Sequence, residues 1–174
     1  MNGDNIPDVK SMSDADLSAL CDKLRNKIIE TVMKNGGHLS SNLGMVELTV
    51  ALHYVFDFPK DKVIYDVGHQ CYTHKLLSGR ADKFDTLRKL GGISGFPKRE
   101  ESEYDCYNTG HAGTSISAAL GIAKARDIKG EDFNVIAVIG DGSFNNGLVY
   151  EAFNSVSEIN TCLLYTSPSP RDCS

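Results

Sequence analysis

The sequence contains no long apolar run. Its longest uninterrupted aliphatic stretch, Val135–Ile139, is far shorter than the ~20 residues that a bilayer-spanning helix needs, so we expect no membrane span. The sequence also lacks a cluster of five or more basic residues, and its net charge is -5, which argues against a protein that coats nucleic acid. No charged-then-apolar leader opens the chain, and its first residues are acidic and polar. A cytoplasmic location is therefore the default expectation.

Cysteine pairing motifs are missing as well. The five cysteines form an odd number, and no two of them occupy a Cys-x-x-Cys pair. A disulfide scaffold or a zinc knuckle therefore has no support. We expect free thiols that mostly fill the core, at Cys21, Cys71, Cys106, Cys162 and Cys173.

The composition is that of an ordinary globular protein, with 174 residues, 41% hydrophobic and 24% charged. Ser13 and Asp16 can cap a helix, and apolar residues then recur every three or four positions up to Asn35-Gly36-Gly37. Short β-prone runs at 63–67 and 134–139 predict buried parallel strands. Further helices are expected at 43–56, 69–77, 114–126 and 147–157, with mostly loop and one short helix at 79–109. This order is typical of an α/β fold with a parallel sheet flanked by helices.

The last segment, 162–174, has a different character. Cys162–Asp172 can be back-translated into a string that resembles the transposase adapter ligated to DNA during sequencing-library preparation; a natural tail rich in Pro and Ser is the alternative. We expect an adapter-derived tail, with the natural sequence stopping near Thr161 in mid-domain. On that expectation the strand that should follow the 147–157 helix is missing. The tail is not expected to replace it, because Pro168 and Pro170 lack the N–H groups that a ladder needs.

Gly140-Asp141-Gly142 follows the second predicted strand and precedes a helix. Glycines there let a ligand approach the backbone closely, the helix directs its N–H groups and positive dipole end toward the turn, and the Asp141 carboxylate suits Mg²⁺. A metal-bound diphosphate fits all three features. A plain strand-to-helix turn with Asp141 as its N-cap is the alternative. A dinucleotide site is disfavoured, because Asn145 stands where the third glycine of its motif belongs.

Three histidines follow a glycine at the boundary of a predicted element: His38, His69 and His111. A histidine in such a place can donate to phosphate or transfer protons near neutral pH. Any one of them alone is better explained as structural, but three together with the Gly-Asp-Gly turn favour a functional site. We interpret His53 and His74, which lie inside predicted helices, as structural or solvent-facing.

Longer motifs join these residues in order. The sequence reads GHLSSNLG from Gly37, DVGHQCYTHKLLSGR from Asp66, ESEYD from Glu101, GHAGTSIS from Gly110 and GDG from Gly140. Over roughly residues 14–160, these segments resemble 1-deoxy-D-xylulose-5-phosphate synthases, a family of transketolase-like enzymes that depend on thiamine diphosphate. The block 66–80 is specific to this family, whereas the Gly-Asp-Gly turn is shared by the whole superfamily.

The resemblance implies that 1–161 is a truncated N-terminal diphosphate-binding domain. The family condenses pyruvate with D-glyceraldehyde 3-phosphate, releases CO₂, and forms a product that feeds isoprenoid, thiamine and pyridoxal synthesis. Its members use thiamine diphosphate and Mg²⁺ and are homodimers when complete. By resemblance, Asp141 binds the metal and His38 lies on the substrate side as a proton donor or acceptor. The implied cofactor contacts are His69, Gly110, His111, Ala112, Gly142 and Ser143.

Some positions depart from the family pattern. Tyr65 stands in place of the usual Trp, Thr73 in place of Pro, and Ala112 in place of Ser. The second metal ligand of the superfamily, an Asn downstream of Asp141, would fall near Pro170 in the suspect tail, and the glutamate that activates the cofactor belongs to a second domain. The 174-residue chain is therefore expected to be inactive and poorly stable by itself. A transketolase-like enzyme for other sugar phosphates and a non-catalytic phosphate-binding module are the alternatives.

Overall fold

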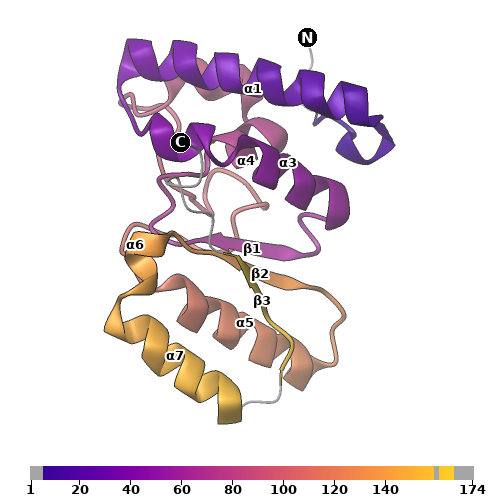
Figure 1. The fold of residues 1–174 in the computed structure, drawn as a ribbon, viewed down its shortest axis with the longest axis vertical. Helices are drawn as coiled ribbons and strands as arrows, with labels where there is room; N and C mark the ends of the chain where they lie inside the picture. The colour runs from indigo at the N-terminus through magenta and orange to yellow at the C-terminus, as the bar shows by residue number, and fades with distance from the viewer. Residues whose placement is uncertain (1–5, 159–160, 167–174) are drawn as a thin grey trace. The chain divides into compact units, whose positions relative to one another are not determined.

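Residues 6–158 and 161–166 are described in the computed structural model, where the chain divides into two units (Figure 1). Met1–Phe56 and His69–Gly95 form the first, which we call the helical unit. Asp57–Gly68 and Phe96–Ser174 form the second, which we call the sheet unit.

The helical unit is built on one long helix. Its elements are η1 (Val9–Ser11), α1 (Asp14–Asn35), α2 (Ser40–Leu43), α3 (Val46–Val55), α4 (Tyr72–Leu77) and η2 (Ala81–Thr86). The α1 cap is the one predicted: the Asp16 N–H donates to the Ser13 hydroxyl at 3.3 Å, and that hydroxyl donates to the Asp16 carboxylate at 2.7 Å. The helix ends at Gly36, whose φ is +76°. Its apolar face packs against α3 and α4.

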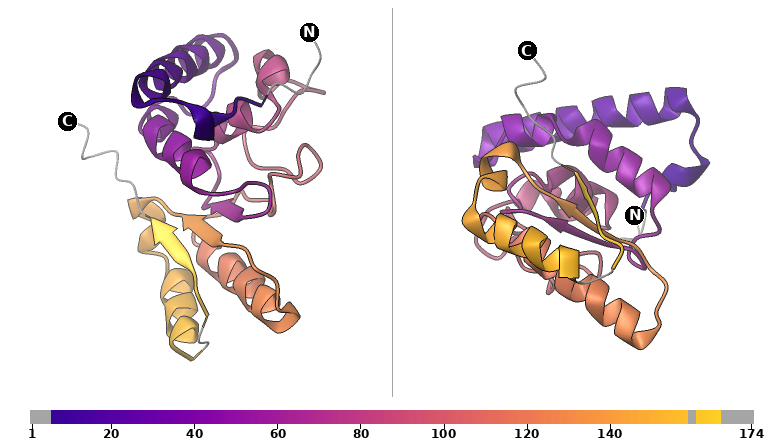
Figure 2. Two further views of the ribbon diagram at one scale, coloured as in Figure 1. Left: turned by 90° about the vertical axis from the view of Figure 1, so that its right-hand side faces the viewer. Right: turned by 60° about the horizontal axis from the view of Figure 1, so that its bottom comes forward.

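The sheet unit has three parallel strands and three helices. They are β1 (Lys62–Tyr65), α5 (Ser115–Lys129), β2 (Val135–Val138), α6 (Asp141–Phe144), α7 (Gly147–Glu158) and β3 (Leu164–Thr166), with strand order β1-β2-β3. Ile64 pairs with Ala137, which pairs in turn with Tyr165. Helices α5 and α7 run side by side along the sheet (Figures 1 and 2). They enclose a core of β-branched and small residues: Ile64, Ile116, Ala119, Ala123, Val135, Ala137, Ile139, Val149 and Ala152.

The α/β order expected from the sequence is confirmed, with changes at element ends. The expected 43–56 helix begins only at Val46, as α3, and the separate short helix α2 precedes it. The expected 69–77 helix begins only at Tyr72. The first strand stops at Tyr65 because Asp66 turns its side chain to other backbone groups and Val67 has a φ of +59°, which no strand residue adopts.

The expectation that no strand follows α7 is wrong. Leu164–Thr166 pairs in parallel with β2, and the Ile139 N–H donates to the Thr166 carbonyl at 3.0 Å. The prolines cited against it, at 168 and 170, lie beyond these three residues and outside the described part of the chain. Two contacts support the strand. The Arg126 guanidinium donates to the Cys162 carbonyl at 3.3 Å, and the Tyr165 ring lies 5.2 Å from that of Phe153.

None of the helices in the described residues combines the length and the apolar character that a membrane span needs. The thiols of Cys21, Cys71, Cys106 and Cys162 are free, as expected, and Cys173 lies outside the described residues. Cys21 and Cys71 are buried, Cys106 is half-buried, and Cys162 is exposed. The expected core role therefore holds for the first two.

The helices α3 and α4 are joined by a buried histidine pair. His53 Nε2 and His74 Nδ1 lie 2.9 Å apart, and the two residues are 8% and 1% exposed. One nitrogen must donate and the other accept, so the pair is structural rather than solvent-facing. Burial first, then the charges of His74 and Arg80, lowers the pKa of His53 to about 2.

We predict that the protein loses stability as the pH falls below the ordinary histidine pKa of 6.5. Between that pH and about 2 the unfolded chain binds a proton at His53 that the folded chain does not, so stability rises with pH across this window. The contribution is complete above 6.5 and is lost progressively below it, by up to about 1.4 kcal/mol per pH unit. Chemical denaturation at about pH 7.5 and about pH 5 measures the effect. His53→Gln keeps an amide donor for His74 and should flatten the dependence; an unchanged slope in that variant would assign it to other groups.

Candidate active site

The helical unit brings together two of the predicted site residues, His38 and His69. Their ring centroids lie 5.1 Å apart at an interplanar angle of 62°, an edge-to-face arrangement. His38 follows α1 through Gly37, where a Cβ would lie 2.8 Å from the Tyr72 hydroxyl. The φ of Gly37 is +141°, so both the backbone conformation and the space require glycine. After this tight turn, the ring of His38 lies against the ring of His69, which is distant in the sequence.

Asn42, which sequence reasoning did not single out, lies under both histidines. It is fully buried. Its side-chain amide donates to the His38 carbonyl at 2.6 Å and to the His69 carbonyl at 2.8 Å, and its oxygen accepts the Tyr72 N–H at 2.9 Å. The sequence offers only an asparagine in the run Ser-Ser-Asn-Leu, and nothing in that run indicates which residues its side chain bonds.

The sheet unit holds a second residue that sequence reasoning missed. Asp66 comes directly after β1 and is 1% exposed. One carboxylate oxygen accepts the Gly113 N–H at 2.9 Å and the other accepts the Ser115 N–H at 3.0 Å. The Asp66 N–H donates to the Val138 carbonyl at 2.7 Å, which fixes Asp66 to β2. A carboxylate at the carboxyl end of a predicted strand was the signal that could have found it.

The predicted segment Gly110-His111-Ala112 therefore lies just before the residues that Asp66 holds. All three of its residues are exposed. Gly113 has a φ of +83°, and a Cβ there would lie 2.6 Å from Cγ of Asn146. The Asn146 amide also donates to the Ala112 carbonyl at 3.4 Å. Asn146 follows the Gly-Asp-Gly turn, so the two predicted segments of the sheet unit meet at the carboxyl ends of β1 and β2, where ligands bind in open α/β sheets.

The Gly-Asp-Gly turn itself is open to a ligand. Cβ atoms added at Gly110, Gly140 or Gly142 would meet nothing within 4 Å. Asp141 is exposed and opens the short helix α6, with one carboxylate oxygen 2.8 Å from the Gly142 N–H. Gly140 is the N-cap of that helix, so the alternative of Asp141 as an N-cap is wrong.

The start of α7 differs from the expectation. The Asn146 side chain accepts the Leu148 N–H at 3.0 Å, so one of the N–H groups expected to face a ligand is already satisfied. The turn and α6 also bond part of their own backbone, because the Gly142 N–H donates to the Asp141 carboxylate at 2.8 Å and the Ser143 N–H donates to the Gly140 carbonyl at 3.0 Å.

Within the described residues no three His, Cys, Asp or Glu side chains gather to hold a metal ion. A metal at Asp141 would therefore take most of its ligands from outside that set. Mg²⁺ suits this arrangement, because it commonly binds one or two carboxylates together with phosphate oxygens and water. The exposed Asp141 carboxylate beside glycine-lined open space fits a metal–diphosphate ligand, although this part of the chain provides only one side chain for it.

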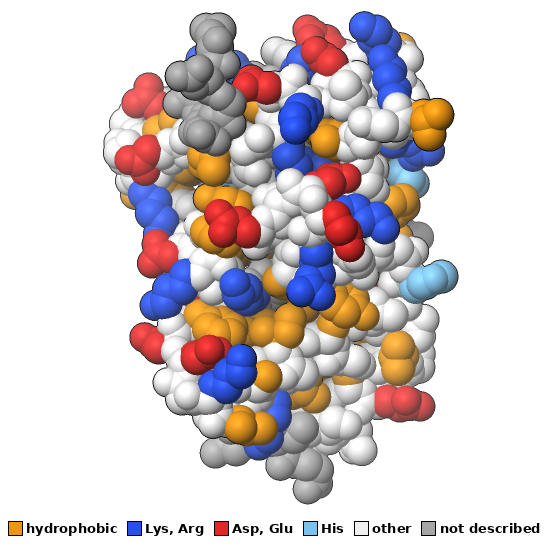
Figure 3. Space-filling model, turned by 180° about the vertical axis from the view of Figure 1, so that it is seen from behind, with side chains coloured by type: hydrophobic (Ala, Val, Ile, Leu, Met, Phe, Trp, Pro, Cys, Tyr) orange, Lys and Arg blue, Asp and Glu red, His pale blue; other side chains and the backbone are white. Residues whose placement is uncertain are grey.

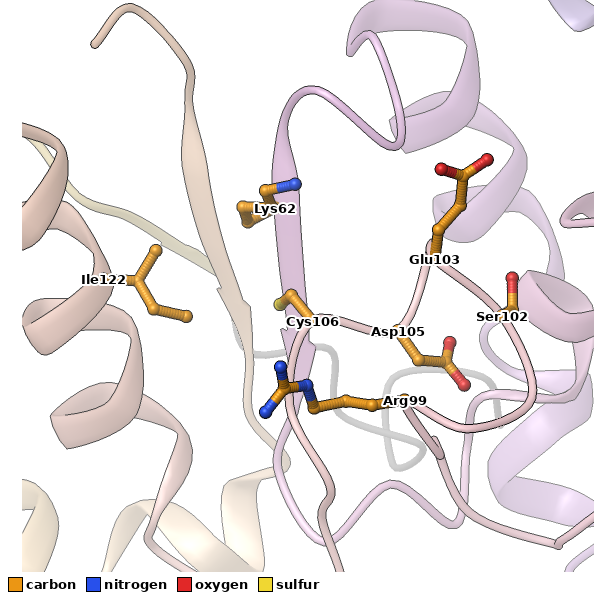
Figure 4. Close-up of a pocket in the computed structure, with 7 residues that line it drawn as sticks. All are labelled: Lys62, Arg99, Ser102, Glu103, Asp105, Cys106 and Ile122. Carbon is orange, nitrogen blue, oxygen red and sulfur yellow. The ribbon is translucent and has the colours of Figure 1, made fainter.

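A separate cavity of about 410 Å³ in the sheet unit contains none of the predicted site residues. Figure 4 shows Lys62 on β1 and Ile122 on α5, with the loop residues opposite. Burial raises the pKa of the Cys106 thiol in its wall to about 11, and that thiol donates to the Val63 carbonyl at 3.3 Å. Cys106 therefore stays protonated near neutral pH and is not a nucleophile.

On the face drawn in Figure 3, acidic and basic side chains are interspersed, so this face presents no electrostatic field of one sign.

Comparison with known proteins identifies relatives over nearly the whole chain. Residues 2–166 match the family model described as 1-deoxy-D-xylulose-5-phosphate synthase. The 1-deoxy-D-xylulose-5-phosphate synthase of Dictyoglomus turgidum is 60% identical over 157 residues, and that of Clostridium tetani is 58% identical over 159. These alignments cover 90% and 91% of this chain but 25% and 26% of the relatives. The chain thus spans about a quarter of the length of the curated relatives it matches.

Solved structures of transketolases share the fold. The transketolase from Leishmania mexicana matches with a TM-score of 0.72 at 20% identity, covering 87% of this chain and 27% of that one. The transketolase from Campylobacter jejuni matches with a TM-score of 0.71 at 23% identity, covering 81% and 26%. The expected transketolase-like α/β fold is confirmed.

We predict that Asp66→Asn loosens the start of α5. The substituted amide would present a donor to one of the two N–H groups, leaving it unsatisfied at a cost of about 1–3 kcal/mol. Amide hydrogen exchange at Gly113 and Ser115 should accelerate, and the free energy of unfolding should fall.

Asp61→Asn is the matched control. Asp61 is also buried, lies just before β1, and accepts the Asn134 N–H at 2.6 Å. This variant should lose similar stability without a selective change at Gly113 and Ser115. Equal exchange at those two amides in both variants would contradict the role given to Asp66.

Proposed function

Because the chain belongs to the 1-deoxy-D-xylulose-5-phosphate synthase family, we propose that it provides part of the active site of an enzyme that condenses pyruvate with D-glyceraldehyde 3-phosphate. The products are 1-deoxy-D-xylulose 5-phosphate and CO₂. The complete enzyme is proposed to be a cytoplasmic homodimer that uses thiamine diphosphate and Mg²⁺. When bound, thiamine diphosphate supplies the nucleophile and the electron sink for decarboxylation and carbon–carbon bond formation.

In the sheet unit, Asp141 is proposed to hold Mg²⁺, and Gly142 and Ser143 to face the diphosphate. Gly110, His111 and Ala112 are proposed to contact the cofactor from the neighbouring segment. The observation that carries this proposal is the meeting of the two segments through Asn146 at the carboxyl ends of β1 and β2. Open space beside Gly110, Gly140 and Gly142 supports it, because a bulky anion needs room close to the backbone.

In the helical unit, His69 is proposed to contact the cofactor, and His38 to give or take protons on the substrate side. Imidazoles suit both tasks near neutral pH. Their edge-to-face arrangement at 5.1 Å supports a shared site, since the two residues come from segments thirty-one positions apart in the chain.

The alternative of a transketolase-like enzyme for other sugar phosphates is less well supported. The transketolases match at 20–23% identity, which speaks to the fold alone. The relatives at 58–60% identity are 1-deoxy-D-xylulose-5-phosphate synthases. The remaining alternative is a non-catalytic phosphate-binding module. An assay for 1-deoxy-D-xylulose 5-phosphate formation distinguishes it from the proposed enzyme.

Since the chain spans a quarter of its relatives, the tests use a chimaeric synthase. In it, this chain's matched 157 residues replace the corresponding segment of the D. turgidum synthase. We predict that Asp141→Ala abolishes the Mg²⁺-dependent formation of 1-deoxy-D-xylulose 5-phosphate, because the metal loses its carboxylate ligand. The activity is measured against Mg²⁺ concentration. Asp132→Ala, which removes an exposed carboxylate elsewhere in the sheet unit, is the control. Unchanged kinetics and Mg²⁺ dependence in Asp141→Ala would rule out the metal assignment.

We predict that His69→Ala and His111→Ala each weaken thiamine diphosphate binding more than they lower the melting temperature. A lost hydrogen bond to a charged group costs about 1.5–3 kcal/mol, or about one to two decades in affinity. Titration calorimetry on the chimaeric synthase gives the dissociation constant, and thermal melting gives the stability. Wild-type cofactor affinity in both variants would return these histidines to a structural role.

A further inference from the structure

The Asn42 side chain joins three segments of the helical unit through its amide. It bridges the carbonyls of His38 and His69, at 2.6 and 2.8 Å, and accepts the Tyr72 N–H at 2.9 Å. These partners lie four, twenty-seven and thirty residues away in the sequence. Both amide hydrogens and the amide oxygen are engaged, and the residue is 0% exposed. An amide provides two donors and an acceptor from one planar group, and no other small side chain does so.

None of these three bonds involves an imidazole nitrogen. Asn42 therefore sets the backbone from which each ring projects and leaves the ring atoms that transfer protons to other contacts. A second constraint acts on the same segment, because the His38 N–H lies 3.5 Å from the Tyr72 hydroxyl and Tyr72 is itself fully buried. The His38 backbone is thus held between Asn42 and Tyr72, while the His69 carbonyl is held by Asn42.

We propose that Asn42 is the positioning residue for the His38–His69 pair. This inference rests on the proposed function, which gives His38 a proton-transfer role and His69 a cofactor contact. A displacement of about 1 Å in a reacting group can cost on the order of 10²-fold in rate, so the shared amide couples both roles to one buried side chain. Asp in its place would keep the acceptor for Tyr72 but set a carboxylate oxygen against two carbonyl oxygens.

The first test compares Asn42→Asp and Asn42→Ala with Leu52→Ala in the chimaeric synthase. Leu52 is buried on α3 in the same unit, so its truncation destabilises the unit without removing a bond to either histidine. At a temperature where all variants are folded, kcat should fall about 10- to 100-fold in both Asn42 variants. Thiamine diphosphate affinity, measured by calorimetry, should fall about 10-fold. Leu52→Ala should keep both values despite a comparable loss of melting temperature. If kcat and cofactor affinity fell in all three variants in proportion to the loss of melting temperature, the proposal would be overturned.

The second test is a double-mutant cycle. Asn42→Ala is combined with His38→Ala and, separately, with His69→Ala. If Asn42 acts through these histidines, its effect on kcat shrinks in the His38→Ala background and its effect on cofactor affinity shrinks in the His69→Ala background. If each histidine variant is impaired by itself but its effect adds fully to that of Asn42→Ala, the positioning role of Asn42 is overturned and the proposed roles of the histidines are not. Unimpaired histidine variants would overturn their assigned roles in the proposed function, and this inference with them.

Discussion

The buried carboxylate of Asp66 determines how the loops at the carboxyl ends of β1 and β2 are held together in the sheet unit. A charged group that is 1% exposed must find strong partners, because its desolvation is costly. Asp66 finds them in the N–H group of Ser115, one of the donors left open in the first turn of α5, and in that of Gly113, just before the helix cap. Its own N–H is bound to β2. The end of β1, the start of α5 and the end of β2 are therefore joined at one residue.

Several features of the sheet unit follow from that junction. The segment Gly110–Ala112 is left exposed just ahead of the anchored residues, and Gly113 lies close enough to Asn146 that a Cβ would not fit. Asn146 in turn caps α7 through the Leu148 N–H. Polar contacts therefore link the loops: the buried Asp66 carboxylate holds Gly113 and Ser115, and the exposed Asn146 side chain bonds to Ala112 just ahead of them.

The sequence predicted the regular elements well and the polar junctions poorly. Helical periodicity and the Ser13 cap located α1, and the β-branched run at 134–139 located β2, because both signals are local. The Asp66 carboxylate acts on partners 47 and 49 residues away, and two of the three Asn42 partners lie 27 and 30 residues away. No local pattern reports such pairings. The third strand was missed for a different reason. The argument from proline concerned positions 168 and 170, which lie outside the described residues, whereas Leu164–Thr166 contains no proline and is supported by Arg126 and Phe153. The roles of the eight predicted site residues stay predictions.

The two units divide the chemical tasks of the proposed reaction. Binding a metal–diphosphate group needs open space and a hard carboxylate, and the sheet unit has both at Asp141 and its flanking glycines. Proton transfer near neutral pH needs imidazoles, and the helical unit holds His38 and His69 5.1 Å apart. The short segment 66–72 bonds within both units, since Asp66 accepts from Ser115 in the sheet unit while His69 and Tyr72 bond to Asn42 in the helical unit. Only two residues separate Asp66 from His69, so the bonds of both units reach into one short turn of the chain.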